Sequence, residues 1–432
     1  MDGSCNIILF VFLWLITLSS IDLCICSASS EAQCITSERD ALLTMKHYLS
    51  DPLNRLASWS PHGINCSHWD FVVCSNITGH ILELHLTTPP PFEFKDEIMR
   101  HYGLVVRNFF GGLQIPDFLG SMTSLKYLNL SHAEFGGRIP LHFWNLSNLI
   151  YLDLSNNYFE GSIPHQIGSL SNLQYLDLGN NYLLNGSIPH QIRNLSNMIH
   201  LDLGGNDFSG SIPQPTGNLS NLFYLHLGGF NLSHEDDYGS YKSFENLQWF
   251  SSLSSFQSLS SLQYLELSYV NLSNAFDWLQ VLHSLLSLRS LTHFLCHKQE
   301  EKKSLQFLHL ASNNLSRKIP DCWMTWPYLT TVILENNNFN GILPTSMGSL
   351  LWLQMLYLRN NNVLRNFPTI LKDKANLISL DLGDNQFSGV IPSWVGQSLS
   401  NLKVLVLRSN KFFSSIPSEI CAMSSLQILD FA

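Results

Sequence analysis

Leucines recur along the chain with a period of 24 or 25 residues. The stretch from Leu149 to Pro164 reads LIYLDLSNNYFEGSIP, with leucines at its first, fourth and sixth positions. Apolar residues at alternate positions predict a short strand with one buried face, and one such unit cannot cover that face alone. We therefore expect the units to stack, with their strands in one parallel sheet. The units begin at Leu125, Leu149, Leu173, Met198 and Leu222, and again at Leu305, Leu329, Leu353, Leu377, Leu402 and Leu426.

An asparagine at the ninth position of most units marks the end of the predicted strand. Its amide can bond backbone groups of adjacent repeats in the turn, so its replacement by leucine should cost roughly 1–3 kcal/mol. The glycine that follows permits a positive φ, and an Ile-Pro pair such as Ile163-Pro164 fixes the return path. Alanine, phenylalanine and valine replace the asparagine at Ala133, Phe230 and Val270. The asparagines are Asn157, Asn181, Asn206, Asn313, Asn337, Asn361, Asn385 and Asn410.

The period breaks within three segments, 87–111, 233–261 and 288–304. The first leucines of neighbouring units stand 40 residues apart between Leu222 and Leu262, and 43 apart between Leu262 and Leu305. The charged run within the last segment is typical of a solvated loop. The alternative is that it marks a site from which whole repeats were deleted. The chain also stops seven residues into a repeat, which we interpret as a truncated or incomplete product.

The repeated pattern LxxLxLxxNxxxGxIPxxxxxLxx is similar to the plant-type leucine-rich repeat, from residue 80 to residue 432. The resemblance implies an α/β solenoid, a right-handed superhelix with its parallel strands on the concave face. Residues 31–79 resemble the helical N-terminal cap of plant leucine-rich-repeat receptors, which covers the apolar end of the stack. Ser37 is expected to cap the cap helix. The buried face of that helix should hold Ala41, Leu42, Met45 and Leu49.

The cap departs from the cysteine pattern of plant receptor-like proteins. Their Cys-Cys pair, followed by Trp-x-Gly-Val-x-Cys, has Ser67 in its second place here and Phe71 in the glycine place. The resemblance implies a Cys34–Cys66 disulfide, which would close a loop of about 30 residues for roughly 3 kcal/mol. Cys74 is then unpaired. The alternative is a Cys66–Cys74 bond that leaves Cys34 without a partner.

The N-terminus carries an apolar run at 7–21, followed by small residues. A run of about 15 residues is short for a membrane span and fits a secretory signal peptide, which we place at 1–28. An uncleaved signal anchor is the alternative, and no other stretch is apolar enough to span a membrane. Asn-x-Ser/Thr sequons agree with secretion and predict glycosylation. They lie at Asn65, Asn76, Asn129, Asn145, Asn185, Asn194, Asn218, Asn231, Asn271 and Asn314.

Charge and motifs exclude several function classes. Only 13% of the residues are charged and the net charge is −10, which argues against a nucleic-acid partner bound through its phosphates. Motifs of kinases, nucleotide-binding loops and zinc hydrolases are missing, and the cysteine spacing does not match a zinc site. We therefore predict a binding protein that is not an enzyme and has no cofactor and no metal.

Repeated acidic and histidine residues have a simple explanation in the repeat itself. Aspartates occupy the fifth position of several units, on an open sheet face that would exclude no water. We therefore interpret them as part of the repeat consensus rather than as acid–base catalysts. His165 and His190 stand in two nearly identical stretches, which indicates duplication rather than a metal pair. The aspartates are Asp153, Asp177, Asp202 and Asp381.

Aromatic residues occupy the third position of the units in the first part of the chain. These side chains should point outward from the strands, on the concave face, where tyrosine provides contact area for a ligand. The alternative is a family-typical strand in which no single tyrosine has a ligand role. Later units carry Thr331, Met355, Ser379 and Val404 there, and the Asn129 sequon lies on the same face. The candidate ligand-binding residues are Tyr127, Tyr151, Tyr175, His200, Tyr224, Tyr264 and Phe307.

The whole chain resembles the plant receptor-like proteins, which are surface receptors without a kinase domain, of the type that recognises fungal xylanase. The segment 269–281 is especially similar to that subgroup. The resemblance implies that an extracellular protein or peptide ligand is bound in plant defence and that a partner kinase signals, at the plasma membrane for full-length members and in the apoplast for this chain. The alternatives are a secreted inhibitor resembling the polygalacturonase-inhibiting proteins and a truncated, non-functional relic.

Overall fold

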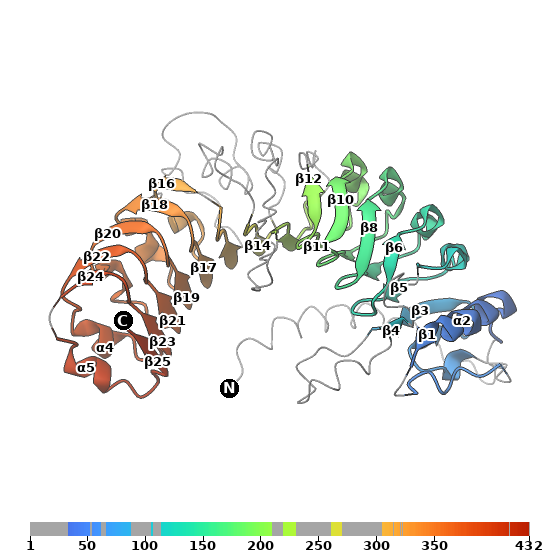
Figure 1. Cartoon of the computed structure of the whole chain (residues 1–432), viewed down its shortest axis with the longest axis horizontal. Helices are drawn as coiled ribbons and strands as arrows, with labels where there is room; N and C mark the ends of the chain where they lie inside the picture. Colours follow the sequence, from blue (N-terminus) through green and yellow to red (C-terminus); the bar gives the residue numbers. More distant parts are fainter. Residues whose placement is uncertain are drawn as a thin grey trace, which may run out of the picture.

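Each repeat contributes one short strand to a common sheet. In the computed structural model, a 14-stranded sheet runs from the cap to the last repeat, and Figure 1 shows its strands along the inner side of an arc. The first pair, β2 (Val72–Cys74) and β3 (Ile81–His85), is antiparallel, and all later pairs are parallel. The structure describes residues 33–51, 54–61, 66–87, 105–106, 114–209, 219–229, 261–269, 305–313, 315–319, 321, 323–413 and 415–431.

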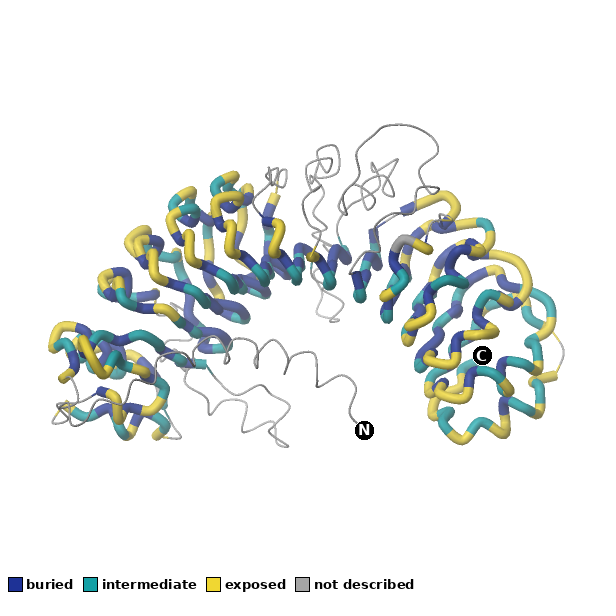
Figure 2. Tube along the Cα trace, turned by 180° about the vertical axis from the view of Figure 1, so that it is seen from behind, coloured by how far each residue is buried: buried dark blue, intermediate teal, exposed yellow. Residues whose placement is uncertain are grey.

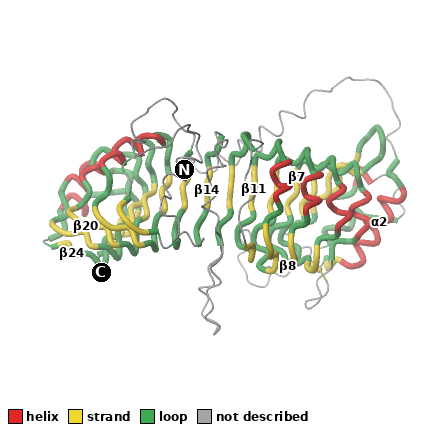
Figure 3. Tube along the Cα trace, turned by 90° about the horizontal axis from the view of Figure 1, so that it is seen from above, coloured by secondary structure: helices red, strands yellow, loops and turns green. Residues whose placement is uncertain are grey.

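The later strands of this sheet are three residues long and coincide with the predicted LxxLxL segments. The fourth- and sixth-position leucines, such as Leu152 and Leu154, are fully buried. Viewed from above, the strands lie side by side (Figure 3). They are β5 (Tyr127–Asn129), β7 (Tyr151–Asp153), β9 (Tyr175–Asp177), β11 (His200–Asp202), β13 (Tyr224–His226), β14 (Tyr264–Glu266), β15 (Phe307–His309), β17 (Thr331–Ile333), β19 (Met355–Tyr357), β21 (Ser379–Asp381), β23 (Val404–Val406) and β25 (Ile428–Asp430).

Two further parallel sheets and short helices complete the repeats. The flanking strands are β6 (Gly136–Arg138), β8 (Tyr158–Ser162), β10 (Leu183–Ser187) and β12 (Asp207–Ser209), and β16 (Ser316–Lys318), β18 (Asn338–Gly341), β20 (Asn362–Asn366), β22 (Gln386–Gly389) and β24 (Lys411–Phe412). The helices are η4 (Asp117–Ser121), η5 (Leu141–Asn145), η6 (His165–Ser169), η7 (His190–Asn194), η9 (Trp323–Thr325), η10 (Thr345–Ser349), η11 (Thr369–Leu371), α4 (Trp394–Ser398) and α5 (Ser418–Cys421). Exposed residues gather on the outer side of the arc (Figure 2). The observed architecture is the predicted leucine-rich-repeat solenoid.

The ninth-position asparagines form a buried ladder of hydrogen bonds. The Asn157 Oδ1 atom accepts the backbone N–H groups of Ala133 and Phe135 in the preceding repeat. Its Nδ2 atom donates to the carbonyls of Leu130 at 2.8 Å and Leu154 at 3.0 Å. In the second half, the Asn361 Oδ1 atom accepts the N–H group of Phe339, and its Nδ2 atom donates to the carbonyls of Leu334 and Leu358. The predicted role of these asparagines is confirmed, because each satisfies backbone groups of two repeats that the turn leaves open.

A second set of asparagines joins neighbouring repeats on the surface. They stand just before the first leucine of a unit, and each donates to a carbonyl of the preceding repeat, as Asn172 does to Ser147 at 2.9 Å. Tyr328 and Trp352 take this place in two successive units of the second half, where they are 45% and 56% exposed. The surface asparagines are Asn148, Asn172, Asn197, Asn221, Asn376 and Asn401.

The long sequence separations do not interrupt the sheet. Strand β13 pairs with β14, with Tyr224 opposite Tyr264, and β14 pairs with β15, with Tyr264 opposite Phe307. Units whose first leucines stand 40 and 43 residues apart are therefore direct neighbours. The irregular segments at 233–261 and 288–304 lie outside the described residues, apart from residue 261. Within 87–111 the structure places β4 (Val105–Val106), which pairs with β1 (Leu49–Ser50).

The cap helix α2 (Thr36–Tyr48) buries most of its predicted face, with Leu42, Met45 and Leu49 at most 1% exposed and Ala41 partly buried. The prediction of a Ser37 cap is wrong, because the helix begins at Thr36, two residues earlier than a Ser37 cap implies, and Ile35 stands at its N-cap without a side-chain hydrogen bond. The Ile35 N–H group instead donates to the carbonyl of Gly79. This backbone bond ties the helix start to the turn that precedes β3.

Phe71 has the backbone conformation of the glycine that it replaces. Its φ is +66°, in the left-handed region where a side chain costs roughly 1–2 kcal/mol. The guanidinium of Arg55 lies 4.6 Å from the centre of the Phe71 ring, and Arg55 also donates to the carbonyl of Thr87. A cation over an aromatic ring is favourable by about 0.5–2 kcal/mol. The Arg55 contact therefore offsets part of the cost of the phenylalanine.

Candidate ligand-binding face

The third-position side chains of the first half form one continuous stack, here called the ring row. Adjacent strands bring equivalent positions into register, so each ring lies over the next. From Tyr151 to Phe307, neighbouring ring centres are 4.0–4.2 Å apart and their planes differ by at most 15°. Tyr127 joins Tyr151 at 6.1 Å. The structure thus brings together all seven predicted residues, Tyr127, Tyr151, Tyr175, His200, Tyr224, Tyr264 and Phe307.

Stacking decides which parts of these rings a ligand can reach. Within the row, the two faces of rings such as Tyr175 and Tyr224 are covered by their neighbours. Each of the seven side chains is partly buried. Because their faces are covered, the rings present edges, together with the hydroxyls of the tyrosines. The ring row is therefore a ridge of polar and aromatic edges rather than a set of open aromatic platforms.

A second line of side chains runs beside the ring row at the fifth position of the same strands. This acid–histidine row crosses β7 to β15, and its members meet across the strands. The His226 Nδ1 atom lies 3.0 Å from Oδ2 of Asp202, and His309 Nδ1 bonds the Glu266 carboxylate. Its members are Asp153, Asp177, Asp202, His226, Glu266 and His309.

Sequence reasoning placed the aspartates of this row but missed His226, Glu266 and His309. Their shared signal is the fifth position of each unit, two residues after a ring-row residue. Residue type alone hides that signal, because three residue types (aspartate, histidine and glutamate) share this position along the row. The long separations before Glu266 and His309 also obscure it.

Burial shapes the ionisation of the acid–histidine row. Burial raises the pKa of Asp177 well above its usual value, and repulsion from Asp202 and Asp153 adds to the shift. Burial also raises the pKa of Asp153, which is only 8% exposed. The expectation that this face would exclude no water is therefore wrong for Asp153. The neighbouring rings of the ridge shield these carboxylates from solvent.

The pKa values of His200 and His226, at the centre of the face, are shifted in opposite directions. Burial lowers the pKa of His200 to about 4, despite the nearby Asp202 carboxylate. Burial also lowers the pKa of His226, but the hydrogen bond and charge of Asp202 outweigh it, so the net shift is upward. Asp202 is therefore paired with one imidazole, while the imidazole of His200 stays neutral at physiological pH.

Most of the described glycosylation sequons lie away from this face. Asn145 and Asn194 are exposed at the ends of η5 and η7, and Asn76 and Asn185 are exposed as well. Asn129 lies on the concave face, where its Oδ1 accepts the N–H and hydroxyl groups of Ser131. The remaining sequons, at Asn65, Asn218, Asn231, Asn271 and Asn314, are outside the described residues, as is the expected signal peptide at 1–28.

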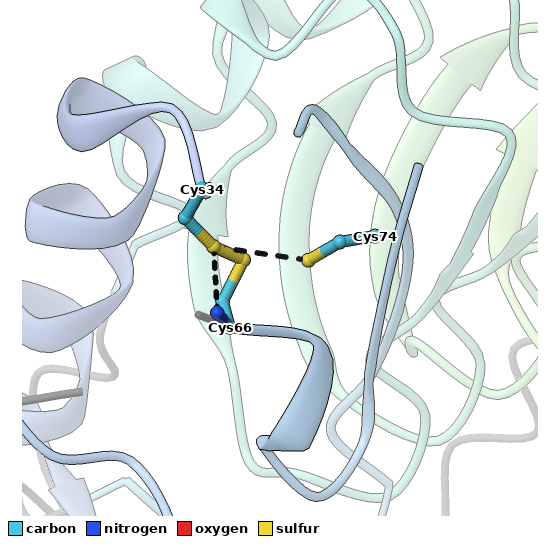
Figure 4. A group of neighbouring side chains, drawn as sticks. All are labelled: Cys34, Cys66 and Cys74. Atoms are coloured by element: carbon cyan, nitrogen blue, oxygen red, sulfur yellow. Dashed lines mark hydrogen bonds between the residues drawn. A yellow bond between two sulfur atoms is a disulfide. The ribbon is translucent and has the colours of Figure 1, made fainter. Parts of the chain in front are cut away.

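The cap contains the expected disulfide between Cys34 and Cys66. Cys74 is unbonded, and its Sγ lies 3.9 Å from that of Cys34 (Figure 4). Of the two pairings considered, the structure has the one implied by the resemblance. Burial and the charge of Glu38 raise the pKa of the Cys74 thiol to about 11. The thiol therefore stays protonated at neutral pH, which makes it a poor nucleophile toward the adjacent disulfide.

Comparison with known proteins agrees with the repeat and the cap. Family models described as leucine rich repeat match residues 123–183, 151–208, 304–326, 328–350, 376–398 and 401–423. The model described as leucine rich repeat N-terminal domain matches residues 35–75. Among the described residues, none of the helices combines the length and the apolar character needed to cross a bilayer.

Two tomato (Solanum lycopersicum) proteins are similar in sequence. Receptor-like protein EIX2 is 37% identical over 127 residues, which cover 26% of this chain and 12% of that protein. Receptor-like protein EIX1 is 33% identical over 153 residues, which cover 31% of this chain and 15% of that protein. The matched segments thus span less than a sixth of the length of these relatives.

A solved structure extends the similarity over most of the chain. The leucine-rich-repeat ectodomain of the Arabidopsis receptor kinase HAESA, in complex with an N-terminally extended IDA peptide hormone, superposes with a TM-score of 0.68 and 27% identity. The match covers 91% of this chain and 56% of that one. Repeat, cap and sequence similarity lead to one assignment. The chain has the leucine-rich-repeat fold, and its sequence is similar to plant receptor-like proteins.

Proposed function

We propose that this chain is an extracellular receptor-like protein whose concave face binds an extended segment of a protein or peptide ligand. The observation that carries the proposal is the ring row, which runs unbroken from β5 to β15 beside the acid–histidine row. A ridge of ring edges and hydroxyls offers both apolar contact and hydrogen bonds along its length. Both are needed to hold a peptide backbone and its side chains.

The charges of the face suit a ligand with basic side chains. Among the described residues, Asp177 and Asp202 form no ion pair with a lysine or arginine of the chain. A lysine or arginine of the ligand would supply the missing positive charge and benefit from the low dielectric beside the rings. The likeness to a peptide-bound ectodomain supports a peptide or protein as the ligand class.

The biological role that we propose is perception of a microbial protein in plant defence, with a partner kinase carrying the signal and with no enzymatic activity in this chain. Support comes from the similarity to the two tomato receptor-like proteins. The exposed sequons at Asn76, Asn145, Asn185 and Asn194 support a secreted, glycosylated protein at the outer face of the plasma membrane or in the apoplast. Removal of N-glycans should lower the mass of the secreted chain.

The ligand hypothesis is testable with a fungal xylanase as the probe. Biolayer interferometry with the immobilised chain should detect binding that falls by at least about tenfold in a Tyr175→Ala/Tyr224→Ala double variant, because central aromatic side chains dominate binding energy. Met355→Ala is the matched control, since Met355 holds the same position on β19 in the second half. Its binding should stay within about twofold of the original.

Two outcomes would contradict the proposal. The first is xylanase binding that survives loss of both tyrosines in a chain that is folded by circular dichroism. The second is inhibition of a fungal polygalacturonase by the chain in a hydrolysis assay, which would assign it to the secreted inhibitors instead.

A further inference from the structure

Three side chains at the centre of the concave face bring metal-binding atoms close together. Asp177 on β9, and His200 and Asp202 on β11, each have a nitrogen or carboxylate oxygen within 4.8 Å of the others. Ligand atoms around a tetrahedral zinc ion stand about 3.3 Å apart, given zinc–ligand bonds of about 2.0–2.1 Å. Small side-chain rotations would therefore bring the three atoms to coordination distance.

His200 is the member of the ring row that could serve as a metal ligand. Its ring stacks between Tyr175 and Tyr224 at 4.1 and 4.0 Å, as a tyrosine would. Its Nε2 atom is shielded from solvent and has no hydrogen-bond partner. An imidazole nitrogen left without a partner in such a place loses its bond to water and gains nothing from the protein. Coordination of a cation would remove that deficit.

The two carboxylates are already oriented by other groups. Oδ1 of Asp177 accepts the N–H group of Gly179 at 2.8 Å, and Oδ1 of Asp202 accepts that of Gly204 at 2.9 Å. His226 and the hydroxyl of Tyr224 contact Oδ2 of Asp202. Bonds of this kind hold the carboxylates that ligate metal ions in proteins. Each carboxylate therefore has a fixed direction before any cation arrives.

We propose that Asp177, His200 and Asp202 form a binding site for a divalent transition-metal ion such as Zn²⁺. The donor set of one imidazole and two carboxylates suits zinc and its neighbours rather than calcium or magnesium, which bind oxygen ligands alone. Three protein ligands leave at least one coordination position open to water or to a group of a bound molecule. The site lies on the face proposed to bind a ligand, but it does not depend on that proposal.

Calorimetric titration of the intact secreted chain with Zn²⁺ tests the site. We expect one ion per chain at micromolar concentration, and visible absorption bands when Co²⁺ replaces zinc. His200→Tyr should weaken binding by at least about tenfold and abolish the Co²⁺ bands, since it removes a metal ligand. This variant should fold, because tyrosine occupies five other positions of the ring row. Asp202→Asn should weaken binding similarly while an amide oxygen still accepts the Gly204 N–H group.

The control is Asp381→Asn, at the same fifth position on β21 but with Ser379 where His200 stands. It should bind Zn²⁺ as the original chain does. The proposal is overturned if the original chain binds no Zn²⁺, or if His200→Tyr and Asp202→Asn keep affinities within about twofold of it. Either result concerns the metal alone and leaves binding of xylanase by the concave face as a separate question.

Discussion

The two halves of the solenoid share a backbone and differ in the surface that it carries. From β5 to β15 the third position holds stacked rings, and the fifth position of β7 to β15 holds an acid or a histidine. From β17 to β25 the third position holds Thr331, Met355, Ser379, Val404 and Ile428, without a ring. The asparagine ladder is nevertheless the same in both halves, as Asn157 and Asn361 show. The inward-facing residues thus set the fold, and the outward-facing residues are free to specialise.

The largest expected effect tests whether the two halves really share one core. Asn157→Leu and Asn361→Leu should each lower the free energy of unfolding by about 3 kcal/mol, the upper end of the expected range, because each leaves several buried backbone groups unsatisfied. Urea denaturation would measure both losses. If the loss of unfolding free energy in one half is more than about twice that in the other, the two halves do not share a common asparagine ladder. Asn172→Leu, on the surface, is the control and should cost less than about 1 kcal/mol.

A difference between the halves should also appear with pH. The pKa of His200 is about 4 in the folded chain and about 6.5 in the unfolded chain. Between pH 6.5 and pH 4 the His200 imidazole is protonated in the unfolded chain and neutral in the folded chain. The neutral imidazole therefore contributes its full stability above pH 6.5, and this contribution is lost as the pH falls from 6.5 to 4. Relative to His200→Tyr, the original chain should lose up to about 3 kcal/mol of unfolding free energy from pH 7 to pH 4.

This comparison is made in EDTA, so that bound metal does not contribute. The groups that face His200 (Asp177, Asp202, His226, Tyr175 and Tyr224) are present in both proteins, so their own titrations largely cancel. Met355→Leu adds no titrating group in the second half and should track the original chain at every pH. Parallel pH profiles for the original chain and His200→Tyr would show that burial of this imidazole does not affect stability.

The stacked rings of the first half should contribute more to stability than the side chains at the same position in the second half. Tyr175→Ala removes two ring contacts, at 4.2 and 4.1 Å, each worth about 0.5–1.5 kcal/mol beyond the area that they bury. We expect a loss of about 2 kcal/mol, against about 1 kcal/mol for Met355→Ala, from urea denaturation. Equal losses would mean that the ring row does not stabilise the solenoid through stacking.

The smallest effect concerns the surface asparagines. Trp352→Asn would introduce the residue that six other units carry there, and its Nδ2 should reach the carbonyl of residue 327, by analogy with Asn172 and Ser147. An exposed hydrogen bond contributes little, so we expect a gain below about 1 kcal/mol in thermal or urea unfolding. A loss above about 1 kcal/mol would show that the exposed indole stabilises the second half.

Sequence periodicity predicted the sheet, the strand positions and the asparagine ladder, because each depends on a residue type that recurs at a fixed place. The Cys34–Cys66 bond followed from a family resemblance and is confirmed. His226, Glu266 and His309 were missed because their position in the repeat carries three residue types. The start of α2 was also misplaced, since a backbone bond from Ile35 to Gly79 decides it rather than a capping side chain.

The unbroken pairing of β13, β14 and β15 has a consequence for how such proteins diversify. Neighbouring strands keep their register although their first leucines are 40 and 43 residues apart. The length of the connecting chain can therefore change in evolution without shifting any side chain of the concave face. Insertions and surface substitutions are then independent kinds of variation, so selection can act on one while the other drifts.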